Sequence, residues 1–336
     1  MKCYRIQDDF GLENLVQTEV PDPSCDPSEV LVDIRAVSLN FRDVMTVNGS
    51  YNPDQPLPLI PCSDAAGVVE SVGDDVEEFE PGDRVIPAFA QGWQEGELTR
   101  EKRSTTLGGP LPGTLTEKRA FREQGLVHAP NNLDFSEACT IPCAGVTAWV
   151  ALTNFQTLQP GQRVLLLGTG GVSTFGLLIA KTIGAEVFIT SSSDQKLEQM
   201  ESLGADHTIN YEDNPDWDQV VLDKTNGEGV DHVLEVGGEQ TLSKSLNSAA
   251  FGGQVSLIGV LSGAQPELNL ASALMKRVRV QGILVGSRQD LVEFSRTAEQ
   301  NDIQPVANQV FDFDQAREAF EYVQTGKHTG KVVIEL

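Results

Sequence analysis

The sequence has few cysteines, few basic residues and no long apolar run. Its 336 residues include only five cysteines, an odd number, and none forms a CxxC pair. This pattern excludes a disulfide framework and indicates reduced thiols. No uninterrupted apolar run reaches the roughly 20 residues that span a bilayer, and the first residues, MKCYRIQDDF, lack the apolar core of a signal peptide. We therefore expect a cytoplasmic protein without a membrane partner.

Basic residues are outnumbered two to one by acidic residues. The chain has 24 Lys and Arg against 49 Asp and Glu, a formal net charge of −25. Such a charge argues against nucleic acid or an anionic membrane as the partner. An anionic ligand would have to be attracted by local positive groups. The length suggests two domains, and a hydrophobic fraction of 40% is ordinary for a globular protein with a sizeable core.

The centre of the chain carries the clearest local pattern. Arg163 to Leu167 is a short apolar run that predicts a buried strand. The glycine turn Gly168-Thr169-Gly170-Gly171-Val172 follows, then an amphipathic helical segment containing Gly176, then a second strand from Glu186 to Thr190. This strand–turn–helix–strand unit is typical of dinucleotide binding, in which the helix N-terminus receives the pyrophosphate. The simpler alternative is a tight turn that binds nothing.

The end of the second strand bears on which dinucleotide binds. Proteins that bind NAD usually place an acidic residue there, against the ribose 2′-hydroxyl. This chain has Ser191-Ser192-Ser193, which admits a 2′-phosphate, and Lys196 follows within one helical turn. We therefore expect NADP(H) rather than NAD(H). The alternatives are that Asp194 binds the ribose and that Lys196 is only a solvated lysine.

The residues before this unit have a different pattern. Three short β-type runs, Leu31–Val37, Gly67–Val72 and Arg84–Phe89, are separated by proline and glycine clusters and predict a mostly-β, barrel-like domain. The polar stretch from Gln91 to Gly113 predicts a long loop, either a functional one that shapes a substrate pocket with Trp93 as a wall, or a disordered one.

The residues after the glycine turn alternate between strand and helix patterns. Four more strands are expected at His207–Ile209, His232–Val236, Gln254–Gly259 and Val278–Val285. With the first two they make about six parallel strands in a doubly wound α/β sheet. The C-terminal residues return to a mixed pattern, with a helix near Gln315 to Gln324 and the apolar ending KVVIEL.

Many short motifs stand in one order along the chain. They are SLNFRDV (Ser38–Val44), PLIPCSDAAGVVESVG (Pro58–Gly73), PGDRV (Pro81–Val85), TIPCAGVTAWVAL (Thr140–Leu152), the glycine turn with its helix, LGADHTINY (Leu203–Tyr211), GVDHVLEVGG (Gly229–Gly238), SLIGVLSG (Ser256–Gly263), VGSR (Val285–Arg288) and HTGKVVIEL. Together they resemble the medium-chain dehydrogenase/reductase superfamily over essentially the whole chain. Within it, the chain resembles the zinc-independent alcohol dehydrogenase-like and quinone oxidoreductase-like branch.

The resemblance implies a fold and a division into domains. A GroES-like β-barrel catalytic domain, residues 1–127 and 287–336, would be completed by the C-terminal tail. A Rossmann dinucleotide-binding domain, residues 128–286, would be inserted between these parts. The active site is then expected in a cleft between the domains, where ligands commonly gather. A homodimer through the edge strand Val278–Val285 is also expected.

The resemblance also bears on zinc. Zinc-dependent relatives bind the catalytic metal through a Cys, a His and a third Cys or Asp. The first Cys aligns near Asn40 to Asp43, where there is none, and Ser63 replaces the His, so that only Cys143 remains. One thiolate cannot hold a catalytic zinc, and the four-cysteine structural zinc loop has no counterpart near Gln91–Arg119. We therefore expect no metal, with Cys143 as a small buried residue near the nicotinamide.

The resemblance implies candidate catalytic residues in and after SLNFRDV: Asn40, Arg42, Asp43 and Tyr51. Tyr51 would donate a proton or orient the substrate, or is simply a turn tyrosine. Asn40 would position the nicotinamide or substrate, and Arg42 could bind an acidic substrate group. Asp43 either takes part directly or only holds the local backbone. The tyrosine that related quinone reductases often carry near Met45 is absent.

The resemblance implies the cofactor contacts as well. Gly170, Gly171 and Val172 would meet the pyrophosphate. The 2′-phosphate would be bound by Ser192, Lys196 and Tyr211. The remaining contacts are expected from Thr147 near the nicotinamide, the strand-end glycines Gly237 and Gly259, and the returning segment Gly286, Ser287 and Arg288, with Arg288 facing the phosphates.

The chemistry expected from these parts is hydride transfer from NADPH to a small molecule. Without zinc a simple aldehyde lacks a strong polariser, so the acceptor is expected to be a quinone, an α,β-unsaturated carbonyl or a reactive aldehyde, whose developing charge a hydrogen-bond donor can stabilise. Two alternatives stay open: an NAD(P)-dependent alcohol dehydrogenase acting on a small alcohol or aldehyde, and a non-enzymatic NADPH-binding sensor or structural protein.

Overall fold

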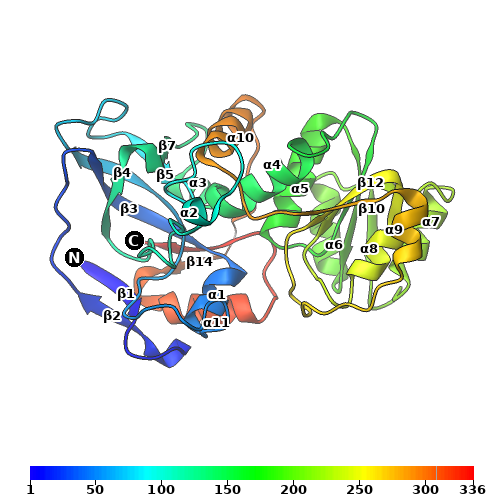
Figure 1. Cartoon of the computed structure of the whole chain (residues 1–336), viewed down its shortest axis with the longest axis horizontal. Coiled ribbons are helices and arrows are strands. Elements are labelled where there is room, and N and C mark those ends of the chain that lie inside the picture. Colours follow the sequence, from blue (N-terminus) through cyan, green and yellow to red (C-terminus); the bar gives the residue numbers. More distant parts are fainter. Residues whose placement is uncertain (308) are drawn as a thin grey trace. The chain divides into compact units, whose positions relative to one another are not determined.

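The computed structural model describes residues 1–307 and 309–336. They form two compact units, one made of Met1–Val146 with Gly286–Leu336 and the other of Thr147–Val285 (Figure 1). The sequence placed the boundaries at 127/128 and 286/287. The first boundary falls later in the structure because α3 (Phe135–Ala138) and the π-helical turn η3 (Ile141–Gly145) pack against the sheet of the first unit.

The second unit is built on a six-stranded sheet in which every pair of neighbours is parallel. Its strands are β8 (Arg163–Leu166), β9 (Glu186–Ser191), β10 (His207–Asn210), β11 (Val230–Glu235), β12 (Ala249–Leu257) and β13 (Arg279–Gly282). Their order across the sheet is β10-β9-β8-β11-β12-β13. In chain order this is 3-2-1-4-5-6, the doubly wound Rossmann order, and the strand order reverses between β8 and β11. The predicted doubly wound sheet is confirmed.

Helices connect these strands as crossovers. They are α5 (Gly171–Ile183), α6 (Asp194–Ser202), α7 (Trp217–Lys224), α8 (Leu242–Ser248) and α9 (Leu270–Lys276), and a further helix, α4 (Val146–Thr153), precedes β8. The central strands are largely buried on both faces, as in β8, where Val164, Leu165 and Leu166 have no exposed surface. A parallel sheet needs this pattern because helices cover both of its faces. The apolar runs read from the sequence therefore mark the sheet interior.

The first unit is mostly β. Its larger sheet runs β14-β15-β3-β4-β5-β7, with β6 also paired to β3, and a separate hairpin pairs β1 with β2. The strands are β1 (Lys2–Ile6), β2 (Leu15–Glu19), β3 (Glu29–Leu39), β4 (Asp64–Val72), β5 (Arg84–Pro87), β6 (Lys118–Arg122), β7 (Leu126–His128), β14 (Gln309–Asp312) and β15 (Val332–Glu335). The C-terminal strand β15 lies antiparallel against β3, with Ile334 opposite Val37. The expected completion of the barrel by the C-terminal tail is thus present.

Helices of the first unit are short except for two near the C-terminus. They are α1 (Phe41–Val47), α2 (Arg100–Arg103), α3, α10 (Arg288–Gln300) and α11 (Ala316–Gln324), with single 3₁₀ turns η1 (Leu12–Asn14), η2 (Glu123–Gly125) and η4 (Phe313–Gln315). Helix α11 packs on α1 and β15 through Ala319 and Phe320, both fully buried. This packing places α1, which carries the candidate catalytic residues Arg42 and Asp43, on the barrel core.

The Gln91–Gly113 stretch differs from the plain loop that its composition predicts. It contains α2, whose first turn is capped by Thr99, because the Thr99 hydroxyl accepts a hydrogen bond from the Lys102 backbone N–H at 3.2 Å. The Trp93 side chain is buried and donates to the Gly96 carbonyl at 2.8 Å. Trp93 is thus held by its own loop.

No helix in the described parts of the chain is long and apolar enough to cross a membrane.

Candidate cofactor and active site

The glycine turn after β8 is open where a dinucleotide would need space. Gly168 has a φ of +70°, in the left-handed region, and a Cβ added at Gly168 or Gly170 would meet no atom within 4 Å. Helix α5 begins at Gly171 with no side-chain cap on its first N–H groups. An uncapped helix N-terminus behind an open glycine turn fits a pyrophosphate.

Gly176, in helix α5 after the glycine turn, has a packing role. A Cβ on Gly176 would lie 2.8 Å from Leu234 Cδ2 and 2.9 Å from Leu166 Cδ2. Helix α5 can therefore approach β8 and β11 this closely only with glycine at this position. The helix N-terminus is in this way held at the carboxyl ends of these two strands, where open α/β sheets bind their ligands.

The ribose-binding end of β9 has one acidic side chain, and that side chain is engaged. Asp194 Oδ1 accepts a hydrogen bond from Asn210 Nδ2 at 2.7 Å. Ser193 caps α6, accepting from the Lys196 N–H at 3.4 Å, whereas Ser192 is exposed. Burial lowers the pKa of the Lys196 ammonium. The end of this strand thus presents a hydroxyl and a lysine, with the carboxylate turned towards β10.

Tyr211 completes this group of residues. Its backbone N–H donates to the Ser191 carbonyl at 3.0 Å, which ties the residue after β10 to the end of β9, and its side chain is exposed. The structure therefore brings Ser192, Lys196 and Tyr211, the three predicted 2′-phosphate residues, to the ends of neighbouring strands. Their contact with a phosphate stays a prediction.

The turn after β11 is held by a buried carboxylate that sequence reasoning missed. Glu235 Oε1 accepts hydrogen bonds from Gly237 N at 2.7 Å, Gly238 N at 3.0 Å and Thr241 Oγ1 at 2.6 Å. Its other oxygen accepts from the Ser245 hydroxyl, and the residue has no exposed surface. The signal was present in the sequence, since an acidic residue at the end of an apolar parallel strand requires partners of this kind.

The remaining cofactor candidates lie in different surroundings. A Cβ on Gly259 would meet the Val236 carbonyl oxygen at 2.6 Å, so glycine is needed where the loops after β11 and β12 approach each other. Thr147 is buried in the first turn of α4. Gly286, Ser287 and Arg288 belong to the first unit, where Ser287 caps α10.

Arg288 uses its donors inside the first unit. Its Nε donates to the Leu126 carbonyl at 2.9 Å, and its Nη2 forms a 2.5 Å ion pair with Glu78. Its backbone N–H donates to the Trp93 carbonyl at 2.8 Å. The guanidinium thus ties the start of α10 to β7 and to Glu78, and the predicted contact with cofactor phosphates would have to compete with these bonds.

The candidate catalytic residues gather at the start of α1. Asn40 precedes the helix, and its backbone N–H donates to Asp43 Oδ2 at 2.8 Å. Asp43 has no exposed surface, and burial raises its pKa from 3.8 to about 6 against the opposing effect of the Arg42 charge. Asp43 therefore closes the first turn of α1, in agreement with the backbone-holding alternative.

Two further charged residues, which sequence reasoning did not identify, lie beside this group. Lys331 is buried and donates to the Leu39 carbonyl at 2.6 Å and to Asn40 Oδ1 at 2.5 Å, and its Nζ lies 3.8 Å from Asp64 Oδ2. Asp64 also accepts from Ser63 Oγ at 2.7 Å. Burial raises the pKa of Asp64, and Lys331 opposes that rise. An ammonium just before β15 thus lies against a carboxylate on β4 and orients the Asn40 amide.

The side chains aligned with zinc ligands do not fit zinc. Asn40 and Ser63 offer an amide and a hydroxyl, and burial raises the pKa of the Cys143 thiol, which disfavours the thiolate that binds metals. Among residues 1–307 and 309–336, no three His, Cys, Asp or Glu side chains come together as a metal-binding group.

The two family models that match the chain cover both units. One, described as an alcohol dehydrogenase GroES-like domain, matches residues 26–131, and the other, described as a zinc-binding dehydrogenase, matches residues 171–300. A zinc-type alcohol dehydrogenase-like protein of Schizosaccharomyces pombe is 43% identical over 99% of both chains. The chain belongs to the medium-chain dehydrogenase/reductase superfamily. The predicted family and its GroES-like and Rossmann-like domains are confirmed.

Solved structures agree with this membership. A crystal structure of an alcohol dehydrogenase from Sinorhizobium meliloti 1021 is 41% identical and superposes with a TM-score of 0.94, covering 100% of this chain and 98% of that one. A structure entitled NAD-dependent alcohol dehydrogenase is 32% identical, with a TM-score of 0.92 and full coverage of both chains. Other members that resemble the chain are named quinone oxidoreductase-like protein 2 and 2-methylene-furan-3-one reductase. The protein is thus an oxidoreductase of this superfamily.

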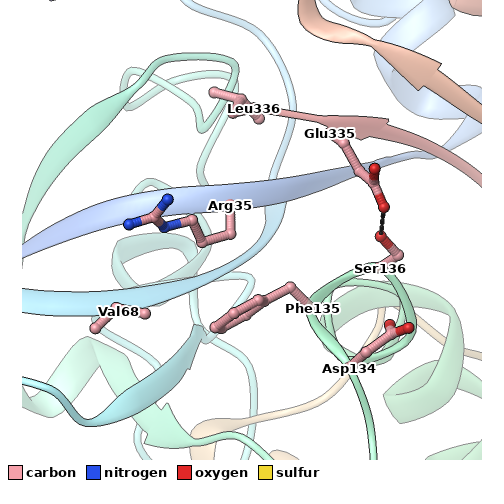
Figure 2. Close-up of a pocket in the computed structure, with 7 residues that line it drawn as sticks. All are labelled: Arg35, Val68, Asp134, Phe135, Ser136, Glu335 and Leu336. Carbon is pink, nitrogen blue, oxygen red and sulfur yellow. Dashed lines mark hydrogen bonds between the residues drawn. The ribbon is translucent and has the colours of Figure 1, made fainter.

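Two surface cavities lie apart from these residues. One, of about 460 Å³, is lined by Arg35, Val68, Asp134, Phe135, Ser136, Glu335 and Leu336 (Figure 2). Its polar groups are paired within the protein, since Ser136 Oγ donates to Glu335 at 2.6 Å and Arg35 forms a 2.5 Å ion pair with Asp33. The other, of about 470 Å³, lies at the start of β8, β11 and β12. Neither contains a predicted site residue.

Proposed function

We propose that this protein is a zinc-independent, NADPH-dependent oxidoreductase that transfers a hydride to a quinone, an α,β-unsaturated carbonyl or a reactive aldehyde. The observation that carries the proposal is the donor set at Asn40, Ser63 and Cys143, in which Asn40 accepts a hydrogen bond from a buried ammonium and burial raises the pKa of the Cys143 thiol, which disfavours a thiolate ligand. Acceptors that need no metal polariser suit such a site.

NADPH is favoured over NADH by the end of β9. The Asp194 carboxylate is bonded to Asn210, and an exposed Ser192 stands beside Lys196 in the next helical turn. A 2′-phosphate would meet a hydroxyl and a lysine there, beside a carboxylate whose Oδ1 is bonded to Asn210. When bound, NADPH supplies the hydride.

The residues of the chain would hold the reactants in place. The glycine turn and the N-terminus of α5 would bind the pyrophosphate, and Thr147 would contact the nicotinamide. The Tyr51 hydroxyl donates a hydrogen bond to the acceptor oxygen, on which negative charge grows as the hydride arrives. Asn40, oriented by Lys331, positions the acceptor. Asp43 acts through the backbone of α1.

The proposal is tested by following NADPH oxidation with an ortho-quinone, a 2-alkenal and a saturated aldehyde. Parallel series use NADH in place of NADPH and enzyme treated with a chelator, and the metal content of the purified protein is measured. We expect turnover of the quinone or the alkenal, a preference for NADPH and no effect of chelation. Bound zinc together with activity lost on chelation would contradict the proposal.

An NAD(P)-dependent alcohol dehydrogenase is the second candidate. It is supported by the similar structure whose title names an NAD-dependent alcohol dehydrogenase. Oxidation of small alcohols with NAD⁺, faster than any reaction of NADPH with the quinone or alkenal, would favour it. A non-enzymatic NADPH-binding protein would bind NADPH and reduce none of the acceptors.

We also propose that the protein is a cytoplasmic homodimer. Its five cysteines are all unpaired, as expected for a reducing compartment. Strand β13 is an edge of the six-stranded sheet, and Val280 on it is 47% exposed. Helix α9, just before it, exposes Leu270, Leu274 and Met275. An edge strand beside exposed apolar side chains is suited to pairing with a second copy.

A further inference from the structure

Arg42 makes a set of contacts that none of the other candidate catalytic residues makes. Its side chain is only 10% exposed, although a guanidinium is costly to bury unless its donors are used. Nη1 donates to the Leu107 carbonyl at 3.0 Å and lies 3.3 Å from Asp43 Oδ1. Nη2 donates to the Gly108 and Gly109 carbonyls at 3.3 and 3.4 Å. Both terminal nitrogens are thus committed within the protein.

The same guanidinium lies between two aromatic rings. Its Cζ is 4.9 Å from the centre of the Tyr51 ring and 5.2 Å from the centre of the Phe89 ring. Cation–π attraction holds a ring and a guanidinium at such distances, and more strongly where water is excluded. One side chain therefore connects the ring of Tyr51 to the turn at residues 107–109.

This turn has little freedom on its other side. Gly108 has a φ of +67°, and a Cβ there would lie 2.6 Å from the Cys62 carbonyl oxygen. At Gly113 a Cβ would lie 2.0 Å from the Pro61 carbonyl oxygen. The turn is thus packed directly on the backbone before β4, and Arg42 is fixed by a rigid partner.

We propose that Arg42 is a positioning residue, which fixes the Tyr51 ring and thereby its hydroxyl against the turn at 107–109, and that it does not bind an acidic group of the substrate. This inference rests on the proposed function, in which Tyr51 contacts the acceptor. The inference favours acceptors that have no carboxylate near the reacting carbonyl. Asp43 balances the charge of the Arg42 guanidinium, and the two terminal nitrogens of that guanidinium already donate to three backbone carbonyl groups.

The activity test is a double-mutant cycle of Arg42→Met with Tyr51→Phe, measured with the quinone or alkenal that the enzyme reduces best. The phenylalanine keeps the ring and removes the hydroxyl that Arg42 is proposed to place. We expect Arg42→Met to lower kcat about tenfold or more in the parent enzyme, with little change in the KM for NADPH, and less than about threefold in the Tyr51→Phe background. Equal losses in both backgrounds would overturn the proposal.

Arg119→Met is the matched control. Arg119 is also a buried arginine, lies 5.1 Å from an aromatic ring (Phe121) and donates to the Gly113 carbonyl of the same stretch, but these contacts do not include Tyr51. We expect any loss it causes to be the same with and without the Tyr51 hydroxyl. Arg42→Lys keeps the positive charge and loses the planar guanidinium with its paired donors, so we expect a kcat between those of the parent and Arg42→Met. Arg42→Lys also replaces Arg42→Met in the cycle if Arg42→Met does not fold.

A second measurement separates this proposal from the proposed function. The chain has four tyrosines, so ring-labelled tyrosine gives a simple NMR spectrum in which Tyr51→Phe assigns the Tyr51 signal. We expect Arg42→Met or Arg42→Lys to shift or broaden that signal and Arg119→Met to leave it in place, whether or not the enzyme turns over any acceptor. An unchanged Tyr51 signal in the Arg42 variants would overturn the link. Inactive parent enzyme with a shifted signal would refute only the proposed function.

Discussion

The side-chain amide of Asn210 holds the carboxylate of Asp194 at 2.7 Å, at the ends of two neighbouring strands. Asp194 is the acidic residue nearest to the position where NAD-binding proteins place their ribose ligand. Its Oδ1 is bonded to an amide on β10, and Ser192 and Lys196 lie beside it. Under the proposed function, the choice of cofactor would depend on these three side chains.

Replacing Lys196 with alanine should change the cofactor preference. The lysine supplies positive charge for a 2′-phosphate, so we expect the KM for NADPH to rise about 10- to 100-fold, on the scale of one lost charge-assisted contact, and the KM for NADH to change less than about threefold. Steady-state kinetics with both cofactors measure this. Lys181→Ala, which removes a lysine paired with Asp206 in the same unit, is the control. Equal effects of Lys196→Ala on both cofactors would show that the lysine is merely solvated.

A valine at Gly170 should block the cofactor without unfolding the protein. The added side chain would enter open space before α5, since no atom lies within 4 Å of its Cβ, and φ is −77°. We expect NADPH affinity, measured by fluorescence titration, to fall at least about tenfold because the pyrophosphate needs that space. Gly282→Val, at a position equally open, should bind NADPH as the parent does. Unchanged affinity of Gly170→Val would remove the turn from the site.

The titration of Asp43 should appear in the pH dependence of stability. Its pKa rises from 3.8 to about 6 on folding, mainly through burial, so the folded state holds the proton more tightly. This stabilisation is complete below about pH 4 and is lost as the pH rises through about 6. Asn at position 43 cannot titrate.

We therefore expect Asp43→Asn to gain stability relative to the parent as the pH rises from 4 to 7, by up to about 3 kcal/mol. Urea unfolding at several pH values measures the difference. Asp75→Asn, at an exposed carboxylate, should give a difference that stays flat over the same range. If the stability difference between Asp43→Asn and the parent also stayed constant from pH 4 to 7, the Asp43 carboxyl group would be ionised over that whole range.

Removing the Glu235 carboxylate should destabilise the dinucleotide unit strongly. Glu235→Ala leaves four donors in the turn after β11 without their acceptor, and unsatisfied buried donors cost about 1–3 kcal/mol each before relaxation. We expect a loss of about 3–5 kcal/mol in urea unfolding, and a smaller one for Glu235→Gln, which keeps one acceptor oxygen. Glu228→Ala, at a side chain that is 71% exposed, should lie within about 0.5 kcal/mol of the parent. A loss below about 1 kcal/mol for Glu235→Ala would contradict this account.

A lysine at Val280 should dissociate the proposed dimer. Val280 is exposed on the edge strand β13, and a charge there disfavours strand pairing between copies. Sedimentation velocity should show a dimer for the parent and a monomer for Val280→Lys. Phe251→Ser, which removes a 79% exposed aromatic side chain on β12, should remain dimeric. A monomeric parent protein would contradict the proposed homodimer.

Much of the fold could be predicted because it follows from local patterns in the sequence. The apolar run at Arg163–Leu167, the glycine turn and the positions of later strands predicted the parallel sheet, whose order then matched the doubly wound arrangement. The boundary after Val146 and the short helix α2 were not predicted. Both depend on how short segments pack or are capped. The amino-acid composition of a stretch does not show that one threonine caps a helix.

The candidate site was predicted unevenly for the same reason. Residues of the glycine turn were found because backbone geometry demands glycine there, and the group from Asn40 to Asp43 was found as a motif. Lys331 was missed because its partners Leu39 and Asn40 lie 292 and 291 residues away in the chain. Glu235 was missed because it ends an apolar run, although its partners lie within ten residues of it. Arg42 was found as a candidate, but its contacts with the 107–109 turn were not.

The sequence by itself indicated the family, through an ordered set of motifs that resemble it. It also predicted the two kinds of domain and the glycine turn, because these follow from periodicity and from residues whose backbone conformation has few alternatives. Only the tertiary structure decided which charges meet: Lys331 with Asn40, Asp194 with Asn210, and Arg42 with Tyr51 and three carbonyl groups. A side chain's partner is set by the register and packing of segments far apart in the chain, and these distances do not exist until the sheet and barrel have formed.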